Sequence, residues 1–151
     1  LYRDGAVFVS NDQDNDADMI DDLIHELAHA AEDIYAREIY SDNKVQQEFL
    51  GKRRRLRDLL YQYGYLDGKN IPFLEVEYSK KLDDFLHKDL GYDKLETFCS
   101  GLFIRPYAVT SVREYFATAL EHYLLEDPEY VKRLSPVVYR KVEMVCNVDE
   151  V

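Results

Sequence analysis

The sequence predicts a single domain of the α+β class that is mainly helical and carries a small sheet. Apolar residues recur at helical spacing from position 19 to about position 40, with no Gly or Pro between them. Asp-Pro and Ser-Pro pairs near the C-terminus predict further helix starts. A short apolar run at 6–10 follows Gly5 and predicts a strand. At 151 residues, the chain is long enough to bury one core.

The elements follow in order from these signals. The first helix should begin near Ala17, with Asp16 as its N-cap. Thr110 or Ser111 should cap a later helix that ends near residue 125 and has Glu114 at its third or fourth position. For the segment 95–104 the sequence allows either a strand or an irregular wall. The other helices are expected at 45–63, at 74–90, from Asp127-Pro128 onward and from Ser135-Pro136 to about 145. We see no internal repeat or linker, so residues 1–151 are treated as one domain.

Charge and composition limit the classes of molecule that the chain is expected to bind. A formal net charge of -11 argues against nucleic acid, because phosphate binding requires a surface rich in Lys and Arg. The basic run at 52–57 predicts a solvated helix face, with an anion-binding patch as the alternative. No apolar run reaches membrane-spanning length and no signal peptide is visible, so we expect no membrane partner. Cys99 and Cys146 are expected to be free thiols, although one disulfide stays open. Localisation and oligomeric state are not indicated.

The strongest helical segment contains His25-Glu26-Leu27-Ala28-His29, which fits the pattern H-E-x-x-H. Residues four apart lie one turn apart on the same face, so both imidazoles can bind one zinc ion at about 2.0–2.1 Å. Zinc lowers the pKa of a bound water toward about 7, and a neighbouring Glu can accept its proton. The sequence therefore predicts a zinc site with His25 and His29 as ligands and Glu26 as the general base.

A catalytic zinc site requires a third protein ligand. The metzincin pattern would have Gly and His at the positions of Glu32 and Tyr35, so that class is excluded. The best candidate is Glu114, which opens an apolar helix where an unpaired buried carboxylate would be costly. The alternative is an exposed first-turn Glu favoured by the helix dipole. Glu121 and His122 on the same helix are weaker rivals for the metal.

Three segments together resemble the gluzincin metallopeptidases of the anthrax lethal factor catalytic-domain type. They are GAVFVS at 5–10, HELAHA at 25–30 and YAVTSVREYFA at 107–117. The resemblance implies that Glu114 is the third zinc ligand, in an E-[FY]-F-A context. It implies that Tyr107, seven residues earlier, stabilises the oxyanion; the alternative is an ordinary aromatic after proline. Where the family often has an acidic residue, this chain has Thr118.

The resemblance also implies a gluzincin-like fold with a small sheet beside the motif helix. The long interval between the motif and Glu114 indicates a helical insertion at about 41–104. We expect a zinc-dependent endopeptidase that hydrolyses a protein or peptide substrate, which could pair with the strand at 6–10. The acidic surface would steer basic substrates toward the chain. The alternatives are a non-catalytic metal-binding interaction domain that retains the fold, and a helical domain in which the motif is a coincidence.

Overall fold

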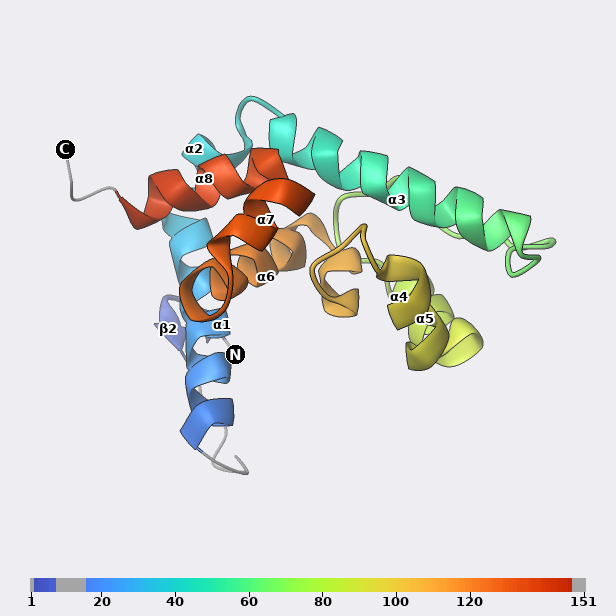
Figure 1. Cartoon of the computed structure of the whole chain (residues 1–151), viewed down its shortest axis with the longest axis horizontal. Helices are drawn as coiled ribbons and strands as arrows, with labels where there is room; N and C mark the ends of the chain where they lie inside the picture. The colour runs from blue at the N-terminus through green and yellow to red at the C-terminus, as the bar shows by residue number, and fades with distance from the viewer. Residues whose placement is uncertain (1, 8–15, 148–151) are drawn as a thin grey trace.

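The computed structural model describes residues 2–7 and 16–147. Its elements are labelled in Figure 1 where there is room. They are β1 (Tyr2–Arg3), β2 (Ala6–Val7), α1 (Asp16–Ile34), α2 (Ala36–Tyr40), α3 (Lys44–Gln62), α4 (Lys80–Asp84), the π-helix η1 (Phe85–Leu90), α5 (Tyr92–Cys99), the 3₁₀-helix η2 (Pro106–Val109), α6 (Val112–Leu125), α7 (Pro128–Leu134) and α8 (Pro136–Cys146).

The fold is all-α, so the predicted α+β class with a small sheet beside the motif helix is wrong. Strands β1 and β2 have two residues each and pair antiparallel, with Arg3 opposite Ala6. A pair of this length forms too few cross-strand contacts to act as a layer of the fold. The core of the described residues instead lies between helices. The strand predicted at 6–10 is described only at Ala6–Val7; positions 8–10 lie outside the described residues.

Helix α6 is the centre of the packing. It contacts α1, η2, α7 and α8, and Figure 1 shows it between α1 and the pair α7 and α8. Its side chains Phe116 and Ala117 are fully buried, and Leu120 is nearly so. The facing residue of α1, Ala28, is also fully buried and is small enough to let a neighbouring helix come close. The α1–α6 contact therefore fixes the motif helix against the helix that carries Glu114.

The first predicted helix is divided in two. It was expected to continue to about position 40, but α1 ends at Ile34 and α2 begins at Ala36. Between them Tyr35 leaves the helical conformation, with φ -105° and ψ 20°. The change of direction lets α2 bury Ile39 completely, whereas Ile34 is 72% exposed. Burial of one apolar side chain therefore accompanies the break.

Helix α3 carries the basic run at 52–57. The prediction that this run forms a solvated helix face is wrong for one of its residues. Arg53 is fully buried. Its Nε donates to the Val109 carbonyl at 2.6 Å, and its Nη1 donates to the Phe73 carbonyl at 3.0 Å. Its neighbour Arg54 is exposed. One basic residue of the run therefore joins α3 to the loop after it and to η2.

The structure differs from the sequence prediction at two segments in the middle of the chain, 74–90 and 95–104. The helix predicted at 74–90 begins only at Lys80, where the Ser79 hydroxyl accepts a hydrogen bond from Leu82 N. The segment left open at 95–104 is helical as far as Cys99, within α5, and irregular from 100 to 104, so a strand there is excluded. Leu95 and Cys99 are both buried and lie four residues apart, which is the spacing of one helix face.

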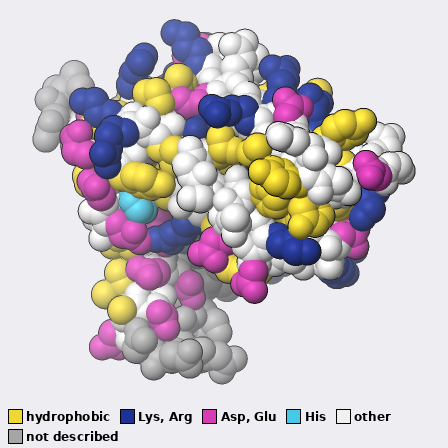
Figure 2. All heavy atoms as spheres, turned by 45° about the vertical axis from the view of Figure 1, so that its right-hand side comes forward, with side chains coloured by type: hydrophobic (Ala, Val, Ile, Leu, Met, Phe, Trp, Pro, Cys, Tyr) yellow, Lys and Arg dark blue, Asp and Glu magenta, His cyan; other side chains and the backbone are white. Residues whose placement is uncertain are grey.

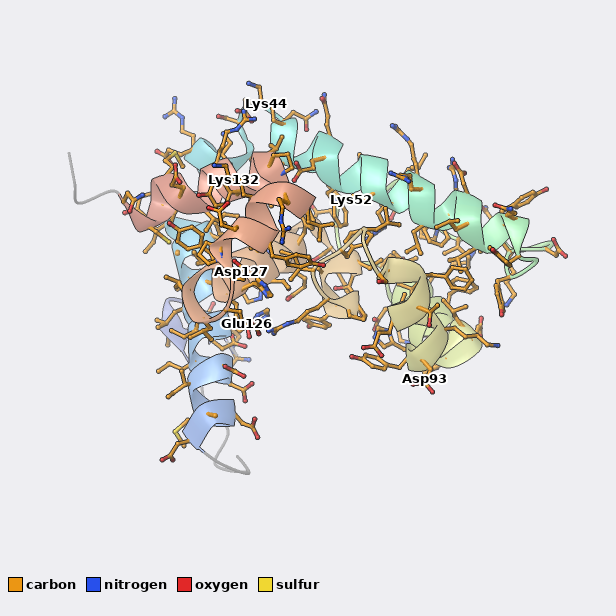
Figure 3. The ribbon with its side chains drawn as sticks, viewed as in Figure 1. Lys44, Lys52, Asp93, Glu126, Asp127 and Lys132 are labelled. Carbon is orange, nitrogen blue, oxygen red and sulfur yellow. The ribbon has the colours of Figure 1, made fainter. Side chains whose placement is uncertain are left out.

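The C-terminal helices begin where the Asp-Pro and Ser-Pro pairs predicted. Asp127, labelled in Figure 3 at the junction of α6 and α7, accepts a hydrogen bond from Glu129 N at 3.0 Å. Lys52 of α3 donates to the Leu134 carbonyl at 2.8 Å. The N-terminus of α8 is satisfied from α3, because the Glu48 carboxylate accepts from Val137 N at 2.8 Å. These bonds fix α7 and α8 against α3.

Two remaining expectations concern the surface. Cys99 is buried and Cys146 is exposed, and both are free thiols, which excludes a disulfide between them. Among the described residues, no helix is both long enough and apolar enough to span a bilayer.

Candidate metal centre

Helix α1 presents the two motif histidines to one point. His25 and His29 lie one turn apart, and their rings meet edge to face with centroids 4.9 Å apart. Both direct Nε2 toward Glu114 of α6. The distances are 2.9 Å from His25 Nε2 to Glu114 Oε2 and 3.0 Å from His29 Nε2 to Glu114 Oε1. The structure thus brings together the three residues that the sequence singled out as ligands.

Local structure explains how Glu114 reaches this point. The Ser111 hydroxyl caps α6 by accepting a hydrogen bond from Glu114 N at 3.2 Å, which places Glu114 at the third helical position. Its side chain is only 16% exposed. Glu114 therefore lies in the first turn of α6, as the alternative supposed, but its side chain is not exposed, so the dipole alone does not account for its position.

The donor set fits zinc. One ligand atom from each of His25, His29 and Glu114 lies within 4.8 Å of the others. A tetrahedral zinc ion with bonds of about 2.0–2.1 Å holds its ligand atoms about 3.3 Å apart. The observed N–O distances of 2.9 and 3.0 Å require only a small outward shift to reach that spacing. Two imidazoles and one carboxylate are also the ligands of one of the known catalytic zinc sets.

The charges of these groups are strongly coupled. Burial raises the pKa of Glu114, but its contacts with the two imidazoles outweigh burial and hold this pKa at about 2. For His25, burial lowers the pKa, but Glu114 and Glu121 outweigh it and raise the value to about 9. A carboxylate and an imidazolium that stabilise each other in this way must separate when a cation takes the place of the proton.

Glu121 orients His25 from behind. Its Oε2 lies 2.9 Å from His25 Nδ1, and its Oε1 accepts from Arg105 at 3.0 Å. Arg105 in turn bonds to Glu126, which Figure 3 labels at the end of α6. A carboxylate on Nδ1 fixes the tautomer that leaves Nε2 available for a metal. Glu121 was weighed as a rival ligand; the structure gives it this supporting contact, three positions beyond Thr118.

Of the other sequence candidates, His122 lies outside the cluster of His25, His29 and Glu114. Its Nδ1 is 3.1 Å from a Glu126 oxygen, and its ring packs at a tilt of 50° against Tyr130, with the centroids 5.4 Å apart. His122 is therefore not one of the residues that the structure brings to the candidate centre.

A cleft of about 360 Å³ opens beside the candidate centre. Glu26 lines it next to both histidines. Tyr107 of η2 lines it as well, with its ring centroid 6.1 Å from that of His25. Burial, followed by the Glu114 carboxylate, raises the pKa of Tyr107 to about 12, so its hydroxyl is protonated at neutral pH. A proton acceptor and a hydroxyl donor therefore share one cleft with the three possible ligands.

Two residues of the cleft were not predicted. Tyr78 belongs to the loop before α4, and its hydroxyl donates to Asp83 at 3.0 Å. No pattern around it signals this position. Arg113 precedes Glu114 and donates from Nε to Glu32 Oε1 at 2.9 Å. Glu32 did have a signal, because it follows His25 and His29 at helical spacing on the same face of α1.

Comparison of the chain with protein-family models, with curated proteins and with solved structures finds no match in any of the three. The candidate centre is therefore the observation from which a function can be argued.

Proposed function

We propose that this chain is a zinc-dependent endopeptidase of the gluzincin type. The observation that carries the proposal is the convergence of His25, His29 and Glu114 in a cleft that Glu26 and Tyr107 also line. A bound zinc ion would supply Lewis-acid polarisation of the scissile carbonyl and acidification of the attacking water. Side chains of the protein would carry out the proton transfer and stabilise the developing negative charge.

Each of these side chains has a role that its position allows. Glu26 accepts the proton of the attacking water and delivers it to the leaving amine. Tyr107 donates a hydrogen bond to the carbonyl oxygen as negative charge develops there. Glu121, held by Arg105, keeps His25 in one tautomer. The 41–104 insertion contributes Tyr78 to the wall of the cleft in which an extended peptide would lie.

The test begins with zinc content. Wild-type protein should bind one zinc per chain, and Glu114→Ala should lose it, whereas Glu129→Ala, an exposed carboxylate on α7, should retain it. No zinc in the wild type after incubation with the metal would refute the proposal.

Turnover is tested second, with a peptide mixture analysed by mass spectrometry. Wild-type protein should cleave peptides, and Glu26→Gln should lose about 10²–10⁴-fold in rate because the general base is removed. Zinc bound at full occupancy with no cleavage of any peptide would instead favour the non-catalytic metal-binding interaction domain.

A further inference from the structure

A second cavity of about 550 Å³ adjoins the cleft. The two share Tyr78, Ser111 and Arg113 as lining residues, so a chain bound in the cleft has direct access to the second cavity. The floor of this cavity, which we call the side pocket, is formed by the end of α1, by α2 and by the start of α3. Glu32 and Tyr40 line it there.

Three buried oxygens of the side pocket have no hydrogen-bond partner. Glu32 is 4% exposed, and while its Oε1 accepts from Arg113, its Oε2 is unpartnered. The Tyr40 hydroxyl and Gln46 Oε1 are likewise buried and unpartnered. Burial, followed by the nearby Glu32 carboxylate, raises the pKa of Tyr40, so its hydroxyl keeps its proton at neutral pH. Buried polar atoms nearly always have a partner, so three in one pocket indicate a polar occupant.

The charges around the pocket favour a cation. Three carboxylates line it, on Glu32, Asp33 and Glu77, against one guanidinium, on Arg113. Figure 2 shows acidic side chains on the projecting end of α1 as well, but this is the N-terminal end of that helix and lies away from the side pocket. A cation entering the pocket would therefore be attracted, and an anion could meet only Arg113.

The position of the pocket limits which part of a substrate could enter. Glu32 follows His29 by three residues on α1, which is about 4.5 Å along a helix axis. A long side chain of a residue next to the scissile bond spans that distance. A lysine ammonium offers three N–H donors and no acceptor, which suits the carboxylate oxygen of Glu32, the amide oxygen of Gln46 and the lone pairs of the Tyr40 hydroxyl. The proton of that hydroxyl has the Glu32 carboxylate beside it as an acceptor.

We propose that the side pocket binds a lysine side chain adjacent to the scissile bond, with Glu32, Tyr40 and Gln46 as its hydrogen-bond acceptors. This inference rests on the proposed endopeptidase function for its substrate, but its test does not require turnover.

The experiment measures peptide binding to Glu26→Gln protein, with and without zinc, by fluorescence anisotropy. Labelled Ala/Ser decapeptides carry one central Lys, Arg, norleucine or Glu. We expect the Lys peptide to bind at least about tenfold more tightly than the norleucine peptide, which corresponds to about 1.4 kcal/mol. Adding Glu32→Gln should abolish that preference, whereas Glu38→Gln, an exposed carboxylate on α2 outside the pocket, should preserve it.

A second variant guards against misfolding, because Glu32→Gln also alters the contact with Arg113. Gln46→Leu removes one acceptor and leaves that ion pair intact, so it should reduce the Lys preference in the same direction. Equal binding of Lys and norleucine peptides would mean that water fills the pocket, and tighter binding of Arg or Glu would also overturn the proposal. Cleavage without any Lys preference would reject only the pocket, whereas Lys preference without cleavage by wild-type protein would reject only the peptidase.

Discussion

Arg53 and Glu114 are both charged side chains inside the helical body, and they are satisfied in opposite ways. Arg53, on α3, donates only to backbone carbonyls, of Val109, Phe73 and Glu75. Glu114, on α6, meets only the ring nitrogens of His25 and His29 and borders an open cleft. Backbone carbonyls cannot leave their positions without unfolding the segment, whereas imidazoles can exchange a proton for a metal. The first arrangement is therefore structural, and the second is able to change its partners.

The largest expected effect is on stability, from Arg53→Ala. Loss of the guanidinium leaves buried carbonyls without donors, so the free energy of unfolding should fall by about 3–5 kcal/mol. Urea denaturation followed by circular dichroism measures it. The matched control is Arg54→Ala, whose exposed side chain should matter by no more than about 0.5 kcal/mol. If Arg53→Ala and Arg54→Ala lowered the free energy of unfolding equally, Arg53 would not have the structural role that distinguishes it from Glu114.

The next effect is on catalysis, from Tyr107→Phe. Removal of one donor to the developing negative charge should lower kcat by about 10²–10³-fold, with KM and zinc content unchanged. Steady-state kinetics on a cleaved peptide provide the measurement, and Tyr92→Phe on the exposed side of α5 serves as control. An unchanged kcat would restrict Tyr107 to a packing role.

A smaller effect is expected from Glu121→Gln, which removes the charge behind His25. The affinity for zinc should fall about 10–100-fold, because the ring loses its fixed orientation and some basicity. Competition with a chelator of known affinity measures this change. Glu126→Gln affects the same Arg105 but leaves the contact with His25 in place, so its effect should be smaller. If the order of the two variants is reversed, Glu121 does not act through His25.

The last expected effect is the pH dependence of zinc binding, which amounts to about tenfold per pH unit. Metal binding requires a neutral imidazole, and the pKa of His25 in the protein without metal is raised to about 9. Apparent zinc affinity should therefore rise about tenfold per pH unit between about pH 6.5 and 9 and then level off. Glu114, with a pKa of about 2, stays ionised throughout. A plateau that begins near pH 6.5, the ordinary value for histidine, would contradict the coupling.

The same two groups predict how the stability of the metal-free protein varies with pH. The raised pKa of His25 stabilises the fold fully below 6.5, and this contribution is lost as the pH rises through about 9. The lowered pKa of Glu114 stabilises the fold above 4.5, and this contribution is lost as the pH falls through about 2. Together they are complete only between pH 4.5 and 6.5. Thermal unfolding at several pH values checks this window.

Sequence reasoning succeeded where neighbours in the chain decide the outcome. His25 and His29 share a face because they lie four residues apart, and Ser111 and Asp127 cap helices because their side chains reach nearby backbone N–H groups. These relationships are local. The ligand and base roles stay predictions, although the geometry that they require is present.

Sequence reasoning failed where contacts between distant segments decide the outcome. The basic run gave no sign that Arg53 points inward while Arg54 points outward, because the carbonyls that it meets come from other segments. The fold class was wrong because the apolar run at 6–10 and the family resemblance both led us to expect a sheet, whereas the described strands do not extend beyond two residues each. The helix at Tyr92–Cys99 did carry a signal, in the helical spacing of Leu95 and Cys99.

The separation of the candidate ligands along the chain has a kinetic consequence. His25 and Glu114 are 89 positions apart, with helices α2, α3, α4 and α5 between them. Closing so long a loop costs entropy before its contacts form, so these partners should meet late in folding. A cation that recognises only the completed centre would slow unfolding and leave the folding rate unchanged. Zinc would then act on this chain as a latch on the finished molecule, extending its lifetime without helping it to form.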